Sequence, residues 1–166
     1  YECHPYTPQM WESCLGACRK KGEFETGVIC KSRKGRDVPF FRMTTKNNVP
    51  KKSVFITARH HCSEAPAAYV MEGLVATFFE DSQLGSWLRE NIELTVVPFV
   101  DLDGAIEGDQ GKHRLPHDHN RDYTEFLDKK GIRNAKVYTD DKFGHTWMNA
   151  RFFLDQTLPL LFNPEA

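Results

Sequence analysis

The chain has 166 residues, which is enough for one domain with its own hydrophobic core. A hydrophobic content of 40% and an aromatic content of 12% exclude an intrinsically disordered chain. The formal net charge of −1 gives no field that favours nucleic acid, and no apolar stretch approaches the ~20 residues of a membrane span, so we expect no nucleic-acid partner and no membrane span.

The first predicted element is a helix that begins near Thr7 and Pro8. Threonine is a favoured N-cap, and proline fits the first helical position. The segment 20–22, KKG, ends the helical pattern. The apolar positions at helical spacing are Met10, Trp11, Cys14, Leu15 and Cys18.

The chain opens on Tyr1 without a recognisable signal peptide, so we expect its start to have been trimmed.

Three strands are predicted next. Residues 28–31 and 38–43 form a hairpin, because the polar segment KSRKGRD between them contains Gly35, which is free to adopt a positive φ. The third strand, 54–58, is short, apolar and partly β-branched, which is typical of a strand buried on both faces.

Two helices and a further strand follow. Ser63 is placed to cap a helix whose first turn tolerates Pro66, and a second helix covers about 82–91. This helix leads into the apolar segment IELTVVPFV, residues 92–100, which fits an interior strand. Strand, helix and strand in this order imply a right-handed crossover and a parallel pair. The apolar stripe of the first helix contains Tyr69, Val70, Leu74, Val75, Phe78 and Phe79.

These elements predict an α/β domain with a mixed, largely parallel sheet flanked by helices. There is no internal repeat, low-complexity tract or linker before about residue 123. Beyond it, a polar connection and an apolar segment that fits strand or helix break the regular alternation. We therefore expect an α/β core at 1–123 and a divergent or discontinuous C-terminal segment at 124–166.

The cysteines do not predict a structural framework. Their number is odd and no CxxC pair is present, so the pattern is typical of neither a disulfide scaffold nor a cysteine zinc site. We expect small buried hydrophobic residues, with at most one bridge. The five are Cys3, Cys14, Cys18, Cys30 and Cys62.

Metal-ligating side chains follow the predicted strand 54–58. In the segment ARHHCSE, His61 ends the strand and Glu64 opens the helix, so both side chains can turn toward one point. Imidazole and carboxylate are ordinary zinc ligands, and ligands gather beyond the carboxyl ends of parallel strands. The alternative is that the two histidines are surface residues and that the His-x-x-Glu spacing arises by chance.

A second polar loop spans residues 101–123, DLDGAIEGDQGKHRLPHDHNRDY. Three glycines, Gly104, Gly108 and Gly111, let it turn sharply. Arginine holds a carboxylate through two parallel hydrogen bonds, and a neighbouring asparagine amide can donate to the same oxygens. A metal centre beside such a clamp suggests a substrate with a free carboxylate and a bond to be hydrolysed. The groups concerned are Arg114, Arg121, Asn120, His113, His117 and His119 among six acidic residues.

Together these stretches resemble the zinc carboxypeptidase family. The resemblance includes the hairpin SRKGRDVPFFRM, the ligand segment ITARHHCSE, the turn VPFVDLDG and the arginine-bearing loop that ends in HNRDY. It covers roughly residues 22–123. DLDG in place of the commoner NPDG, and His119 before Asn120, make the chain look like a divergent member, closer to the compact bacterial and cytosolic-type proteins than to the digestive enzymes.

The resemblance implies roles for six residues. His61 and Glu64 look like two zinc ligands, with the adjacent His60 an outer group. Asn120 and Arg121 look like the pair that holds the terminal carboxylate of a peptide substrate. Arg114 matches the arginine that polarises the scissile carbonyl and stabilises the oxyanion. The family uses Zn²⁺-assisted hydrolysis with a glutamate base.

The third zinc ligand and the glutamate base are not recognisable. Only 43 residues follow Tyr123, and His145 in FGHTW is the sole histidine among them; it is a weak candidate for the third ligand. The leading interpretation is a zinc metallocarboxypeptidase that removes the C-terminal residue of a peptide or protein. The alternatives are a catalytically incomplete module that binds peptide C-termini and an N-acyl amino acid amidohydrolase of the same superfamily.

Overall fold

The computed structural model describes residues 5–44, 52–113, 115, 118–119 and 129–131. The chain divides into two compact units, Tyr1–Asp122 and Tyr123–Ala166. Of the second unit only residues 129–131 are described, and the described helices and strands α1 to α4 and β1 to β4 all belong to the first unit.

The first three elements match the predicted order. Helix α1 (Pro8–Arg19) begins directly after Thr7, whose side-chain oxygen caps the helix as expected. Strands β1 (Glu25–Lys31) and β2 (Asp37–Met43) pair antiparallel as a hairpin. Gly35 lies in the connecting turn with φ of 77°, a conformation that glycine adopts without strain.

A parallel strand pair carries the helical crossover. Strand β3 (Lys52–Thr57) pairs parallel with β4 (Ile92–Val97), and helices α2 (Pro66–Phe78) and α3 (Gln83–Asn91) connect them. The sheet order is β1-β2-β4-β3, so a mixed sheet is confirmed. Among the described strands only β3 and β4 pair in parallel, because the hairpin joins β4 antiparallel. Parallel pairing is therefore less prevalent here than the sequence predicts.

The predicted cap of α2 is wrong. Ala65 rather than Ser63 occupies the N-cap position, and no side chain caps the helix. Pro66 takes the first helical position, where its missing N–H costs no hydrogen bond. Ser63 belongs instead to the turn before the helix, with its backbone N–H directed to the carbonyl oxygen of Gln110 at 3.4 Å.

The predicted loop 101–123 begins with a helix. Helix α4 (Leu102–Glu107) starts after Asp101, whose carboxylate accepts a hydrogen bond from the backbone N–H of Gly104 at 3.1 Å. Gly104 thus lies inside a helix, and its expected role in a sharp turn is wrong. Gly108 ends the helix with φ of 75°.

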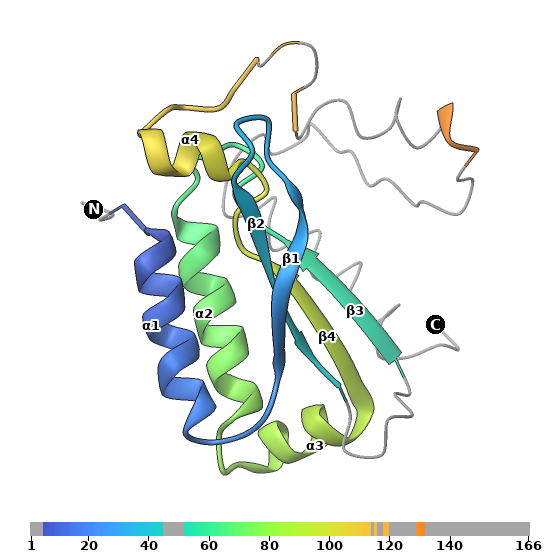
Figure 1. The fold of residues 1–166 in the computed structure, drawn as a ribbon. Helices are drawn as coiled ribbons and strands as arrows, with labels where there is room; N and C mark the ends of the chain where they lie inside the picture. Colours follow the sequence, from blue (N-terminus) through green and yellow to red (C-terminus); the bar gives the residue numbers. More distant parts are fainter. Residues whose placement is uncertain (1–4, 45–51, 114, 116–117, 120–128, 132–166) are drawn as a thin grey trace, which may run out of the picture. The chain divides into compact units, whose positions relative to one another are not determined.

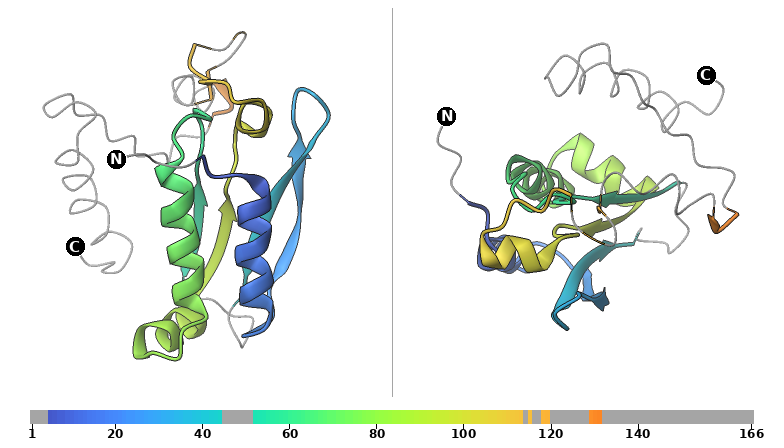
Figure 2. Two further views of the ribbon diagram at one scale, coloured as in Figure 1. Left: turned by 90° about the vertical axis from the view of Figure 1, so that its left-hand side faces the viewer. Right: turned by 90° about the horizontal axis from the view of Figure 1, so that it is seen from above.

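Helices α1 and α2 pack on the same face of the sheet, and the core lies between them and the strands (Figure 2). The carboxyl ends of β3 and β4, the β1–β2 turn and α4 gather at one end of the sheet, and α3 lies at the other (Figure 1). No helix in the described part of the chain is long and apolar enough to cross a membrane. Central core residues are Trp11, Leu15, Phe41, Val75, Phe78, Leu94 and Val96.

The four described cysteines, Cys14, Cys18, Cys30 and Cys62, form no disulfide with one another. Cys18 and Cys62 are buried, as small hydrophobic residues would be, whereas Cys30 is exposed. Burial raises the pKa of Cys14 to about 12, so this thiol stays protonated at neutral pH. Cys3 lies outside the described residues.

Candidate functional site

The turn between β3 and α2 is built onto the neighbouring strand. The backbone N–H of Ala58 donates to Val97 at 3.0 Å, and the N–H of Val100 donates back to Ala58 at 2.9 Å. One step further, the N–H of Asp101 donates to the carbonyl of Arg59 at 2.9 Å. Backbone hydrogen bonds to the neighbouring segment thus continue past the end of β3, and they anchor the segment that carries the predicted metal ligands at the carboxyl end of the sheet.

His61 and Glu64 lie side by side in this turn. Nδ1 of His61 is 2.8 Å from Oε1 of Glu64, and the backbone N–H of Glu64 closes the turn by donating to the carbonyl of His61 at 3.0 Å. The His61 side chain is 2% exposed and that of Glu64 is 43% exposed. The two predicted ligands therefore contact each other, and of the two only Glu64 is open to solvent.

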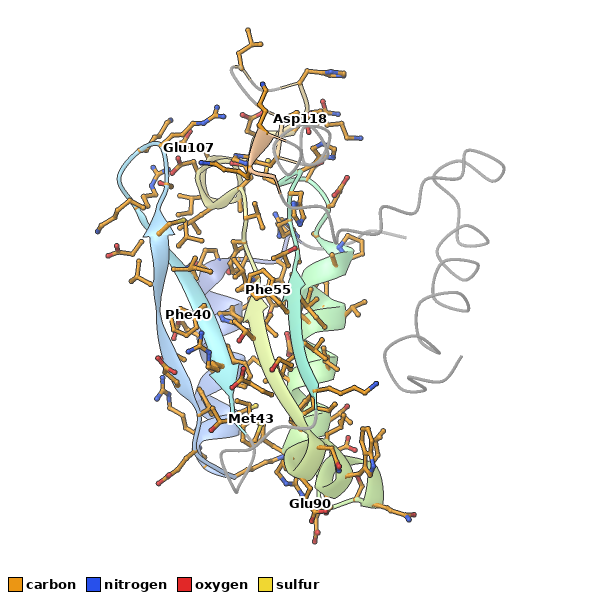
Figure 3. All side chains as sticks on the ribbon, turned by 90° about the vertical axis from the view of Figure 1, so that its right-hand side faces the viewer. Phe40, Met43, Phe55, Glu90, Glu107 and Asp118 are labelled. Carbon is orange, nitrogen blue, oxygen red and sulfur yellow. The ribbon has the colours of Figure 1, made fainter. Side chains whose placement is uncertain are left out.

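Asp118 holds the other ring nitrogen of His61. Its Oδ1 lies 3.0 Å from Nε2 of His61, and its Oδ2 accepts a hydrogen bond from the backbone N–H of His113 at 2.9 Å. The Asp118 side chain is buried and lies beyond the end of β3 (Figure 3). The sequence alone predicts no role for Asp118. Its place close before Asn120 is the only signal, and five other acidic residues in the loop obscure it.

This arrangement directs one nitrogen of His61 to each of two carboxylates. A neutral imidazole has one N–H and one lone pair, yet each nitrogen of His61 faces a carboxylate oxygen. A neutral ring can satisfy Asp118 only by leaving its Nδ1 lone pair against Glu64. A proton or a metal ion between Nδ1 and the Glu64 carboxylate removes this mismatch. The donor set, imidazole plus carboxylate, is one that zinc accepts.

His60 points away from Glu64 and joins two segments. Its Nδ1 donates to the carbonyl oxygen of His119 at 3.0 Å, and its Nε2 accepts from the hydroxyl of Thr57 at 2.8 Å. The carbonyl can only accept, so it sets the ring tautomer. His60 therefore ties the end of β3 to the loop that precedes Asn120 and Arg121.

The loop after α4 packs tightly over the turn. The thiol of Cys62 contacts the carbonyl of Asp109 at 2.6 Å. Gly111, with φ of 82°, leaves no room for a side chain, because an added Cβ would lie 2.7 Å from Asp101 Oδ2 and 2.8 Å from the backbone nitrogen of Cys62. A glycine is required here by both its backbone conformation and this close approach.

An ion network links the β1–β2 turn to α4 at the same end of the sheet. Asp103 accepts from the hydroxyl of Ser32 at 2.9 Å, from the backbone N–H of Lys34 at 3.1 Å and from Nη1 of Arg36 at 2.7 Å. Nη1 of Arg36 also lies 2.9 Å from Glu107 (labelled in Figure 3). Burial raises the pKa of Asp103, but the hydrogen bonds outweigh burial and hold it below its ordinary value.

The remaining predicted site residues lie outside the described residues. They are Arg114, Asn120, Arg121 and His145. Within the described part of the chain, no group of three or more His, Cys, Asp or Glu side chains is arranged to hold a metal ion. The structure thus brings together His61 and Glu64, adds Asp118 beside them, and says nothing of the carboxylate clamp or of a third ligand.

Comparison with known proteins gives a consistent picture. Residues 18–149 match the zinc carboxypeptidase family. Cytosolic carboxypeptidase 6 of Mus musculus is 26% identical over 125 residues, which cover 72% of this chain and 23% of that protein. Cytosolic carboxypeptidase 3 of Mus musculus is 28% identical over 132 residues, which cover 75% of this chain and 13% of that protein.

Solved structures show the same fold. A metallo-carboxypeptidase from Burkholderia cenocepacia superposes with a TM-score of 0.60 at 24% identity, covering 72% of this chain and 33% of that one. A metallo-carboxypeptidase from Pseudomonas aeruginosa gives a TM-score of 0.60 at 22% identity, covering 78% of this chain and 37% of that one. The chain therefore spans well under half the length of each of these proteins.

Proposed function

Because the chain belongs to the zinc carboxypeptidase family, we propose that it serves in a zinc-dependent metallocarboxypeptidase, a hydrolase that cleaves the C-terminal peptide bond of a peptide or protein. The observation that carries the proposal is the position of His61 between Glu64 and Asp118. A buried imidazole with a carboxylate oxygen at each nitrogen can hold a cation on one side while the other carboxylate orients the ring. The exposed side, at Glu64, is the one that an ion from solvent reaches.

The donor geometry fits such an ion. Ligand atoms at about 2.1 Å from a tetrahedral zinc lie about 3.4 Å apart, and Nδ1 of His61 is 2.8 Å from Oε1 of Glu64. A shift of the half-exposed Glu64 side chain by a few tenths of an ångström suffices. In this proposal Asp118 accepts a hydrogen bond from Nε2–H, which keeps the Nδ1 lone pair directed toward Glu64.

The residues of this chain have different proposed roles in the reaction. When bound, zinc lowers the pKa of its water to about 7 and polarises a carbonyl group. His61 and Glu64 hold the ion, and Asp118 keeps the imidazole in the required tautomer. Arg114 is proposed to stabilise negative charge on the carbonyl oxygen. Asn120 and Arg121 are proposed to bind the terminal carboxylate of the substrate, which restricts cleavage to chain ends.

The proposal is tested with peptides that carry a free or an amidated C-terminus. The zinc-loaded full chain should release the last residue of the free peptide and leave the amidated peptide intact. A chelator should abolish release, zinc addition should restore it, and His61→Ala should lose both zinc and activity. Release that persists in chelator contradicts the proposal, as does binding of free C-termini without any cleavage by the zinc-loaded chain, which is the behaviour of a binding module.

A further inference from the structure

Arg59 combines two costly features directly before the candidate ligands. Its φ is 58°, in the left-handed region that a residue with a Cβ adopts only at a cost in free energy. The residue is 5% exposed, although arginine is almost never fully buried unless paired. Among the described residues no carboxylate forms an ion pair with it. Strain of this kind persists where the surrounding structure imposes it, often at functional sites.

The Arg59 guanidinium donates hydrogen bonds to its own turn and to the segment before α1. Nε donates to the carbonyl of Cys62 at 2.6 Å, and Nη1 donates to the carbonyl of Tyr6 at 3.0 Å. The Arg59 Cζ lies 5.7 Å from the ring centroid of Phe99. One side chain thereby joins three segments: the turn, the residues before α1, and the residues after β4. Cys62 lies in the chain between His61 and Glu64, so the bond to its carbonyl fixes the backbone between the two candidate ligands.

Glycine at this position would adopt the same φ without strain and would bury no charge. What arginine adds is the pair of bonds to the carbonyls of Cys62 and Tyr6. A lysine cannot reproduce them, because a single ammonium lacks the planar fork that reaches two acceptors along fixed directions. The chemistry of the residue therefore matches a task of holding backbone, and the backbone it holds is the ligand turn.

We propose that Arg59 is a positioning residue for the metal site: its guanidinium holds the turn so that His61 and Glu64 face one point before the ion binds. This inference rests on the proposed zinc site. The hydrogen bond from the Glu64 N–H to the His61 carbonyl closes the turn. The bond from Arg59 to the Cys62 carbonyl holds the backbone of the same turn. Without that support, zinc binding must order the turn, and the ordering cost appears as weaker affinity.

The test compares zinc dissociation constants, measured in the full chain by competition with a chromogenic chelator. Arg59→Gly tolerates the backbone conformation but removes both bonds, so zinc should bind about tenfold more weakly or worse. Arg59→Lys keeps the charge and should show a smaller loss. Far-UV circular dichroism checks whether each variant is folded. If the glycine variant does not fold, the zinc affinity of the lysine variant still tests the role of Arg59.

Arg89 provides a matched control. Its Nη1 also donates to two backbone carbonyls, those of Phe78 and Glu80, but at the connection of α2 to α3. Arg89→Lys should lower thermal stability while zinc affinity stays within about twofold of the unaltered chain. Equal losses of affinity in the Arg59 and Arg89 variants would mean that affinity follows stability, and this would overturn the role of Arg59.

Two further outcomes separate this inference from the proposed function. If the unaltered chain binds zinc and Arg59→Gly binds it equally tightly, only the role of Arg59 is overturned. If the unaltered chain takes up no zinc, the proposed metal site fails, and the role of Arg59 falls with it.

Discussion

Asp118 determines which nitrogen of His61 is available to a cation. Its buried carboxylate lies 3.0 Å from Nε2 of His61 and accepts a hydrogen bond from the backbone N–H of His113, so it is held from two sides. A metal-ligating histidine commonly donates its other N–H to a carboxylate, which orients the ring and raises its basicity. At the scale of single residues, the site thus consists of three side chains in contact, with His61 between Glu64 and Asp118.

Replacing Asp118 should weaken zinc binding without removing a proposed ligand. An Asp118→Asn side chain loses the charge, and its amide can donate to Nε2, which would favour the tautomer with the proton on Nδ1. We expect zinc affinity to fall roughly 10- to 100-fold, measured by chelator competition. Asp109→Asn is the control, because Asp109 lies in the same loop and its carboxylate accepts from Gln110 N–H at 2.5 Å rather than from His61. Unchanged affinity in Asp118→Asn would contradict the role.

At the scale of elements, local capping signals are reliable only where nothing else competes. Thr7 and Ser82 cap α1 and α3 with their side-chain oxygens. Ser63 has the same chemistry, but its own backbone N–H is directed to the loop after α4 and it lies outside the helix. The backbone carbonyls of Glu64 and Ala65 accept from the first helical N–H groups instead. Tertiary contacts at the site therefore override a local preference.

This contrast gives a stability prediction. Ser82 Oγ accepts a hydrogen bond from the backbone N–H of Gly85 at 3.0 Å, so Ser82→Ala should lower the free energy of unfolding by about 1 kcal/mol. Ser63→Ala removes no helix cap and should change it by less than about 0.5 kcal/mol. Urea denaturation measures both. A loss in Ser63→Ala as large as that in Ser82→Ala would show that the capping assignments are wrong.

The apolar stripe of α2 shows the same limit of sequence reasoning within an element. The helix itself is predicted, but of the six stripe positions Val70 is 70% exposed and Tyr69 is 38% exposed. Val75 and Phe78 are buried, as expected, together with Ala68 and Met71. Helical periodicity allows more than one apolar face, and only the position of α1 and the sheet selects the face that is buried.

At the scale of the whole molecule, sequence reasoning succeeds where an element has a recognisable residue pattern and fails where a contact has none. The β1–β2 hairpin and the β3–β4 crossover follow from Gly35, β-branched runs and helical spacing. Helix α4 (Leu102–Glu107) escapes prediction because its six residues are too few for a periodic signal. The pairing of His61 with Asp118 joins residues 57 positions apart, and one chain alone offers no pattern that reveals it.

A second long-range contact, at Asp103, predicts a pH dependence of stability. Hydrogen bonds from Arg36, Ser32 and Lys34 overcome the effect of burial and depress the pKa of Asp103 below its ordinary value of 3.8. A carboxyl group whose pKa is lower in the folded chain stabilises the fold above the unfolded pKa. That contribution is lost as the pH falls through the folded value. Folding at neutral pH therefore depends partly on a contact between the β1–β2 turn and α4.

Asp103→Asn should accordingly lower the free energy of unfolding by about 1.5–3 kcal/mol at pH 7, because it removes charged hydrogen bonds at a side chain that is 12% exposed. The difference from the unaltered chain should be constant above about pH 5 and shrink below about pH 4, measured by urea denaturation across pH. Asp37→Asn is the control, since Asp37 pairs with Lys31 while 54% exposed and should cost less than about 1 kcal/mol. A deficit in Asp103→Asn that persists unchanged at low pH would mean that packing rather than charge joins the turn to α4.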